Sequence, residues 1–178
     1  MLLTTLVLAP FVGSLLAALM PQDARNRESW LAIGVTVCGL LLGGLLFPPV
    51  ASGAVVRTEF AWLPAMGLNF ALRVDGLAWI FSMLVLAIGL LVVLYARYYM
   101  SAEDPVPRFF SFLLAFMGSM LGVVLSGNLV QLVVFWELTS LTSFLLIGYW
   151  HHRADARRGA RMAFTVTATG GLCLLVGV

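Results

Sequence analysis

Six apolar segments separated by short polar links constrain this chain more than any other feature of its sequence. Each is about 17 to 22 residues long, close to the ~20 residues that a helix needs to cross a ~30 Å hydrocarbon core. In lipid the backbone polar groups must be paired internally, so such segments fold as helices. We therefore predict an all-α, polytopic transmembrane helix bundle with six helices, at about residues 2–20, 30–47, 77–96, 109–125, 128–149 and 162–178.

Composition supports a membrane protein and excludes several other classes. The chain is 62% hydrophobic and only 10% charged, whereas about a quarter of the residues in a soluble domain are charged. No loop carries a catalytic constellation or a nucleotide-binding glycine motif, which argues against a soluble enzyme. Cys38 and Cys173 lie in different apolar segments without CxxC spacing, so we interpret them as buried, inert thiols. The sequence predicts no cofactor and no metal site.

The distribution of arginines predicts the orientation. All ten basic residues are arginine. With the N-terminus outside, the inner loops carry eight of them and the outer loops carry two, and the opposite orientation inverts this count. The positive-inside rule therefore predicts an N-terminus outside the membrane. The inner set is Arg25, Arg27, Arg97, Arg108, Arg153, Arg157, Arg158 and Arg161, and the outer set is Arg57 and Arg73. Residues 151–161 are interpreted as a basic anchoring loop at the inner face rather than a nucleic-acid site.

Three smaller patterns concern local structure. Residues 69–75 alternate apolar and polar side chains, which indicates a short strand on the membrane surface. Gly39 and Gly43 have the GxxxG spacing of closely packed helices, but chance produces this spacing easily in a glycine-rich apolar segment. Ser101 and Asp104, followed by two prolines, predict a turn before the fourth helix.

Glu137 is the one acid within the predicted spans. It follows Asn128 by nine residues, which at ~1.5 Å per residue is about half of a ~30 Å core. A carboxylate at that depth is unfavourable by ~2.5–3.5 kcal/mol on insertion scales. A purely structural span would be more stable with leucine there, so we predict that Glu137 transfers a proton or handles a cation. The alternative is a packing acid bonded to a neighbouring helix.

The expected surroundings of Glu137 are mostly apolar. At 100° per residue it shares a helix face with Val133, Val134, Leu141 and one polar neighbour, Ser140. Desolvation would favour the neutral carboxyl, whereas a facing cation would favour the charged form. Either state makes the group switchable, which a proton relay requires. No arginine falls inside a span, so the sequence supplies no basic partner.

Three further titratable residues are candidate accessory sites. His151 and His152 begin the basic inner loop; they are either a solvated interfacial pair or a proton-collecting antenna at the mouth of a path. Asp75, close to Arg73 at the start of the third span, is interpreted first as an outer-edge ion pair or a helix N-terminal charge. A transport role for Asp75 is the alternative.

Residues from about 68 to 171 resemble the N-terminal half of the large, A-type subunit of Mrp-type multisubunit sodium/proton antiporters. The most specific segment is FWELTSLTSFLLIGYWHHR, supported by RFFSFLLAFMGSMLGVV. The antiporter-like subunits of respiratory complex I share the DGL, RFF and WE elements but usually read WEGVGLCSYLLIGF. Because LTSLTSFLLIGYWHHR follows Glu137 here, the large Mrp subunit is the nearer resemblance.

The resemblance implies a site and partners. Residues 1–178 would be the N-terminal part of one transmembrane antiporter-like domain in a bacterial cell (inner) membrane, with other Mrp-type subunits, the lipid bilayer, H+ and Na+ as partners and no nucleic acid. In the family, the glutamate matched by Glu137 works with a lysine on a later, broken helix, which we expect beyond Val178. Relatives often carry a lysine early in the sixth helix, where this chain has Met162 beside Arg161. An arginine cannot release its proton, so that link of the implied path is missing.

Three functional hypotheses follow. The first is a secondary transporter subunit that exchanges protons for Na+ in a multisubunit cation/proton antiporter. The second is a proton-pumping subunit of an NADH:quinone oxidoreductase or a membrane hydrogenase. The third is a scaffold that holds other membrane subunits and transports nothing.

Overall fold

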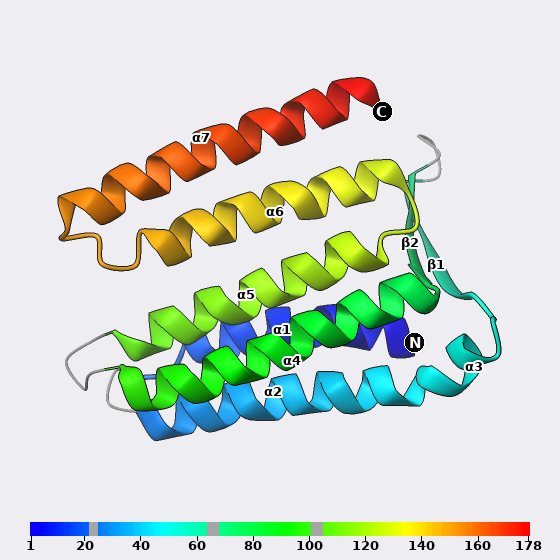
Figure 1. Cartoon of the computed structure of the whole chain (residues 1–178), viewed down its shortest axis with the longest axis horizontal. Helices are drawn as coiled ribbons and strands as arrows, with labels where there is room; N and C mark the ends of the chain where they lie inside the picture. Colours follow the sequence, from blue (N-terminus) through cyan, green and yellow to red (C-terminus); the bar gives the residue numbers. More distant parts are fainter. Residues whose placement is uncertain (22–24, 64–67, 101–104) are drawn as a thin grey trace.

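The computed structural model describes residues 1–21, 25–63, 68–100 and 105–178. Six long helices run up and down side by side, and a β-hairpin closes one end of the bundle (Figure 1). The long helices are α1 (Leu2–Ala18), α2 (Arg25–Leu45), α4 (Gly76–Tyr99), α5 (Val106–Leu125), α6 (Leu129–Ile147) and α7 (Ala154–Gly177). By length and hydropathy, five of them suffice to cross a membrane, and α1 is shorter with 17 residues. The predicted helical membrane bundle is confirmed.

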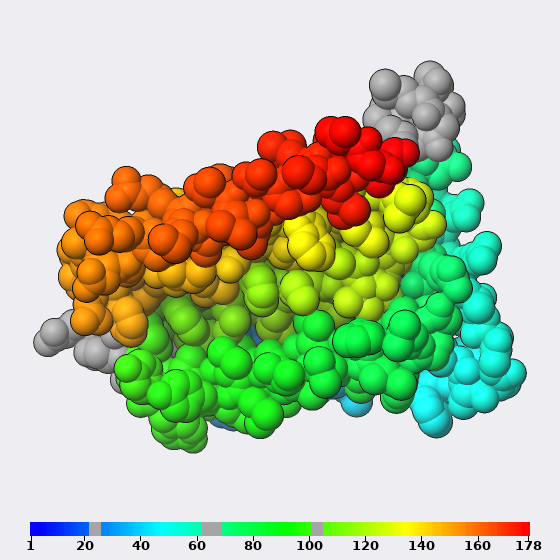
Figure 2. Space-filling view, turned by 45° about the horizontal axis from the view of Figure 1, so that its top comes forward, coloured from blue at the N-terminus to red at the C-terminus, as the bar shows by residue number. Residues whose placement is uncertain are grey.

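The core is centred on α5, which packs against α1, α2, α4 and α6. Its side chains Phe110, Leu114 and Leu121 are fully buried, in a cluster with residues of α1 and α4. In contrast, α7 packs against α6 alone among the long helices with substantial contact, and it forms the edge of the molecule (Figure 2). The bundle is therefore ordered from a buried centre at α5 to an open edge at α7.

Two predicted boundaries are wrong, and both errors come from reading charged residues as loop. Helix α7 begins at Ala154 rather than near residue 162, so most of the predicted basic loop is helical. Arginine is a strong helix former, whereas a hydropathy pattern registers only its polarity. Helix α2 begins at Arg25 rather than at residue 30 for the same reason. After α2 ends at Leu45, Pro48 and Pro49 lie in the first turn of the short helix α3 (Phe47–Ala51), where proline is tolerated.

The predicted strand is present and has a partner. Strand β2 (Leu68–Val74) pairs antiparallel with β1 (Val56–Leu63), with Val56 opposite Val74 and Glu59 opposite Ala71. Leu72 and Val74 are buried while Arg73 is exposed, as the alternation predicts. The predicted turn at Ser101 and Asp104 lies outside the described residues.

The cysteine prediction is wrong in one respect. Cys38 and Cys173 are free thiols, but both are exposed on this chain rather than buried. Each lies on a long apolar helix whose outer face carries other exposed apolar side chains, among them Leu41 on α2 and Leu172 on α7. Such faces suit lipid or neighbouring helices.

Candidate functional site

The N-terminal end of α6 is fixed to the hairpin before the helix begins. Asn128 caps α6 by accepting a hydrogen bond from Gln131 N (2.7 Å), while its Nδ2 donates to Asn69 O (2.8 Å). Gly127 N donates to Ala71 O (2.8 Å), and Ala71 N donates to the buried side-chain oxygen of Gln131 (2.8 Å). These bonds tie the first turn of α6 to β2. They therefore set the depth of every residue that follows on α6.

The rotation of α6 is fixed by close packing on α5. A Cβ built on Gly122 of α5 would collide with the ring of Phe135. Only glycine at position 122 lets that aromatic side chain lie against the α5 backbone. Phe135 and Val133 are buried, whereas Val134 and Trp136 are exposed, so α6 turns a defined face to the core.

Glu137 lies near the middle of α6, and its carboxyl group faces α7. A Cβ built on Gly171 of α7 would collide with Glu137 Oε1 and would lie 3.0 Å from Trp136 Cδ1. Gly171 is itself buried. The carboxyl group therefore rests directly on the backbone of α7, at the edge of the bundle rather than in its centre.

The Glu137 carboxyl is half-buried and incompletely bonded. Its Oε1 is buried, and no described side chain or backbone group donates a hydrogen bond to it. Nearby hydroxyls on α6 bond to their own helix: Ser140 Oγ donates to Trp136 O (3.2 Å) and Thr142 Oγ1 donates to Leu138 O (2.7 Å). A buried acceptor without a donor is unfavourable, so the site suits a proton or a cation.

The accessory candidates lie apart from Glu137 in the fold. Asp75 caps α4 by accepting from Ala78 N (2.9 Å) and pairs with Arg73 (2.9 Å), which is the structural role expected for it. His151 and His152 are exposed at the other end, after α6, with ring centroids 6.1 Å apart. His151 lines a cavity there, described below. The structure brings none of these three side chains into a described contact with Glu137.

One buried acid was missed. Because α2 begins at Arg25, Glu28 lies in its first turn, and the side chain is fully buried with neither carboxyl oxygen bonded to a described group. A longer predicted helix would have included it, since residues 25–29 are compatible with helix. Within the described ranges no cluster of three or more His, Cys, Asp or Glu residues is placed to hold a metal ion.

Family models match two parts of the chain. Residues 62–110 match the N-terminus of chain 5 of NADH-ubiquinone oxidoreductase (complex I), and residues 126–178 match the transmembrane model of NADH:quinone oxidoreductase and the Mrp antiporter. The second match contains α6, Glu137 and α7. Together with the bundle, these matches define a multi-pass membrane protein, and the chain belongs to the antiporter-like family shared by Mrp antiporters and complex I.

Individual relatives confirm the resemblance to the large Mrp subunit. A protein of Rhizobium meliloti (strain 1021), named as the probable A/B subunit of a K+/H+ antiporter, is 62% identical over 178 residues, covering 99% of this chain and 18% of the relative. The A-type Na+/H+ antiporter subunit of Alkalihalophilus pseudofirmus is 40% identical over 172 residues, covering 96% of this chain and 21% of the relative. This chain thus spans about a fifth of the length of each relative.

A solved structure supports the same assignment. The Mrp complex from Dietzia sp. DQ12-45-1b contains a chain that superposes with a TM-score of 0.83 at 30% identity, over 99% of this chain and 19% of that one. An archaeal membrane-bound sulfane sulfur reductase superposes with a TM-score of 0.80 at 22% identity, which shows a shared fold. The two named relatives are antiporter subunits, and both solved structures share the fold of this chain.

Proposed function

We propose that residues 1–178 form the N-terminal part of one antiporter-like domain in the large subunit of a multisubunit cation/proton antiporter. Glu137 carries a proton on its route across a bacterial cell membrane. The observation that carries this proposal is the buried Oε1 of Glu137, which lacks a described donor at mid-helix. A proton on this oxygen, or a basic group beside it, would stabilise the carboxyl group. Transfer of the proton between Glu137 and that basic group would move charge.

The remaining parts of the proposal extend the site. A lysine beyond Val178 would present the missing positive charge to Glu137, and Ser140 would adjust the polarity of the turn that follows it. His151 and His152 would collect protons at the inner face, because imidazole titrates near neutral pH. Other antiporter membrane subunits would cover the exposed apolar faces, including that of α7.

The transported cation has two candidates. The resemblance to the large subunit of sodium/proton antiporters favours Na+, whereas the 62% identical relative is named for a probable K+/H+ antiporter. Within the described residues no carboxylate cluster suited to either ion is present. Exchange should therefore be measured with both ions.

Glu137→Gln tests the proposal. The substitution keeps the shape of the side chain but removes the exchangeable proton. In everted vesicles carrying the intact complex, we expect Na+- or K+-dependent proton efflux to fall by about a hundredfold or to background, as for loss of a proton-transfer group. Proton movement is followed with a fluorescent ΔpH probe, and assembly is followed by co-purification of the subunits.

The matched control is Glu59→Gln, since Glu59 is exposed on β1 and distant in the fold from the middle of α6. It should leave exchange unchanged. Normal exchange in Glu137→Gln with normal assembly would favour the scaffold hypothesis. Proton movement that requires NADH or another reductant instead of a cation gradient would favour the redox-pump hypothesis.

A further inference from the structure

A basic cavity opens at the end of the bundle where α6 ends and α7 begins. Its volume is about 480 Å³. Its charged wall is formed by Arg108 of α5, His151 of the α6–α7 link, and Arg157 and Arg161 of α7. The cavity is therefore lined by residues of α5, α6, α7 and the α6–α7 link. The proposed function assigns no role to its arginines.

The charge of this cavity is strongly one-sided. Among the described residues its lining includes three arginines, which stay protonated in proteins, and no carboxylate. Arg157 Nη1 donates to His151 O (3.4 Å) in the α6–α7 link, and Arg161 Nε donates to Arg157 O (3.3 Å) on α7 itself. Asp155, in the first turn of α7, is exposed and does not line the cavity. Such a site attracts an anion.

The remaining part of the lining is an apolar wall. It is formed by Phe144 and Leu145 of α6 and Ala160 of α7, and Phe144 packs on Phe164 with ring centroids 5.4 Å apart. A freely soluble anion gains nothing from such a wall. An amphipathic molecule with an anionic head and a hydrocarbon tail would be stabilised by both walls.

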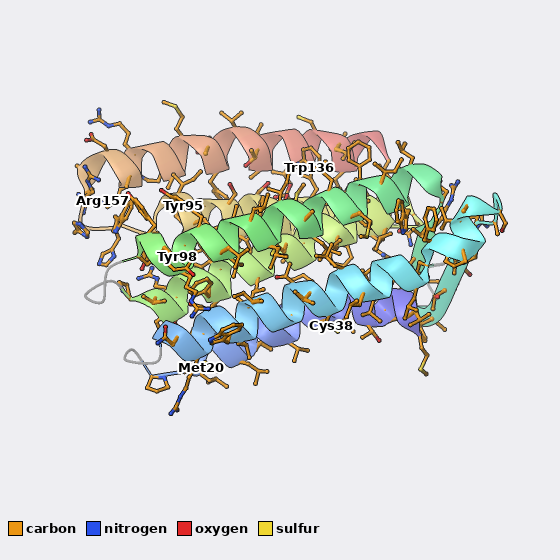
Figure 3. All side chains as sticks on the ribbon, turned by 60° about the horizontal axis from the view of Figure 1, so that its bottom comes forward. Met20, Cys38, Tyr95, Tyr98, Trp136 and Arg157 are labelled. Carbon is orange, nitrogen blue, oxygen red and sulfur yellow. The ribbon has the colours of Figure 1, made fainter. Side chains whose placement is uncertain are left out.

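The cavity lies at the level expected for lipid headgroups. Arg157 is at the same end of the bundle as Tyr95 and Tyr98 (Figure 3). These tyrosines are exposed, and Tyr95 stacks on Tyr99 with centroids 5.1 Å apart. Exposed tyrosines on a membrane helix mark the interface between headgroups and acyl chains. The guanidinium groups are thus placed where lipid phosphates lie.

We infer that this cavity binds the phosphate of an anionic phospholipid, with Arg157 and Arg161 as its principal ligands and the Phe144 wall against the start of an acyl chain. Basic pockets between membrane helices on the inner side are suited to such headgroups. The inference is independent of the role of Glu137. It makes a bound lipid part of the packing between α5, α6 and α7.

Native mass spectrometry of the intact complex tests the inference. Delipidated protein is titrated with dioleoyl phosphatidylglycerol, and in parallel with dioleoyl phosphatidylcholine and inorganic phosphate. We expect one tight phosphatidylglycerol site whose affinity falls about fivefold for each arginine removed, so about 25-fold in Arg157→Gln/Arg161→Gln. The double variant Arg157→Lys/Arg161→Lys, which keeps both charges, should retain most of the affinity.

The matched control is Arg153→Gln/Arg158→Gln. It removes the same charge from two exposed arginines of the same region that do not line the cavity. Equal weakening in both glutamine double variants would overturn the inference, since binding would then follow net charge alone. Equal affinity for phosphatidylcholine, absence of a tight site, or full competition by inorganic phosphate at similar concentration would also overturn it. Since Arg157 also bonds to the loop backbone, Arg161→Gln alone serves as the variant that leaves that bond intact.

Discussion

At the scale of single residues, the chemistry of Glu137 follows from its residue type and its depth in the membrane. The helix that its side chain faces does not follow from them. The helical wheel places Val133, Val134, Ser140 and Leu141 on the same side as the acid. In the structure Val133 and Ser140 are buried, whereas Val134 and Leu141 are 45% and 44% exposed. Glu137 therefore stands at the boundary between the buried and open faces of α6. Its carboxyl is enclosed by α7 rather than by the core.

Gly171 is the residue that makes this enclosure possible, so Gly171→Ala should displace the Glu137 carboxyl. A displacement of about 1 Å at a reacting group can lower a rate by about a hundredfold. We expect cation-dependent proton exchange in vesicles to fall by about tenfold or more, with the complex still assembled. Gly170→Ala is the control, because nothing lies within 4 Å of a Cβ at that position. Equal exchange in the two variants would show that the carboxyl position is unimportant.

At the scale of elements, two kinds of close contact set the geometry of the site. The α5–α6 turn is hydrogen-bonded to β2 through Gly127, Asn128 and Gln131. Gly39 and Gly43 do allow close packing: a Cβ at Gly39 would lie 2.8 Å from Leu86 of α4, and one at Gly43 would lie 2.5 Å from Met83. Their spacing was therefore a real signal for the α2–α4 contact, although nothing in the sequence distinguished it from chance.

Gly122→Ala should destabilise the α5–α6 pair. The added methyl group would force the Phe135 ring out of its position against α5, and overpacking of this kind typically costs about 1–3 kcal/mol. We expect a lower Tm of the purified complex, measured by intrinsic fluorescence. Gly44→Ala, where a Cβ meets nothing within 4 Å, should leave the Tm unchanged or raise it slightly because alanine favours helix. A Tm in Gly122→Ala equal to that of Gly44→Ala would contradict the packing seen between α5 and α6.

At the scale of the whole molecule, the alternating helices separate the arginines. The ends of α1, α4 and α6 meet the starts of α2, α5 and α7 at one end of the bundle, to which eight of the ten arginines belong by sequence position (Figure 1). Arg57 and Arg73 face each other in the hairpin at the opposite end. The positive-inside rule then predicts that the hairpin lies outside the cell.

Cysteine accessibility tests this orientation. In a background with Cys38→Ser and Cys173→Ser, we expect a membrane-impermeant maleimide to label Ser52→Cys in intact cells. His152→Cys should be labelled only in everted vesicles. Both positions are exposed on this chain and lie at opposite ends of the bundle. The reverse labelling pattern would place the N-terminus inside.

A membrane helix bundle could be predicted from the sequence alone, because length and hydropathy decide whether a segment can cross a bilayer with its backbone paired. The sequence also singled out Glu137, since the unfavourable burial of an acid is a property of residue type and depth alone. The strand at 69–75 followed from its two-residue period.

The neighbours of each of these features depend on how the helices and the hairpin pack together. The partner strand β1, the buried position of Glu28 and the contact between Glu137 and Gly171 all depend on which backbones approach each other in space. So does the basic cavity, which joins Arg108 to Arg157 and Arg161 from separate helices. Hydropathy and periodicity report one segment at a time, whereas a site arises from the packing of several segments, and that packing is fixed by side-chain shapes that no single pattern encodes.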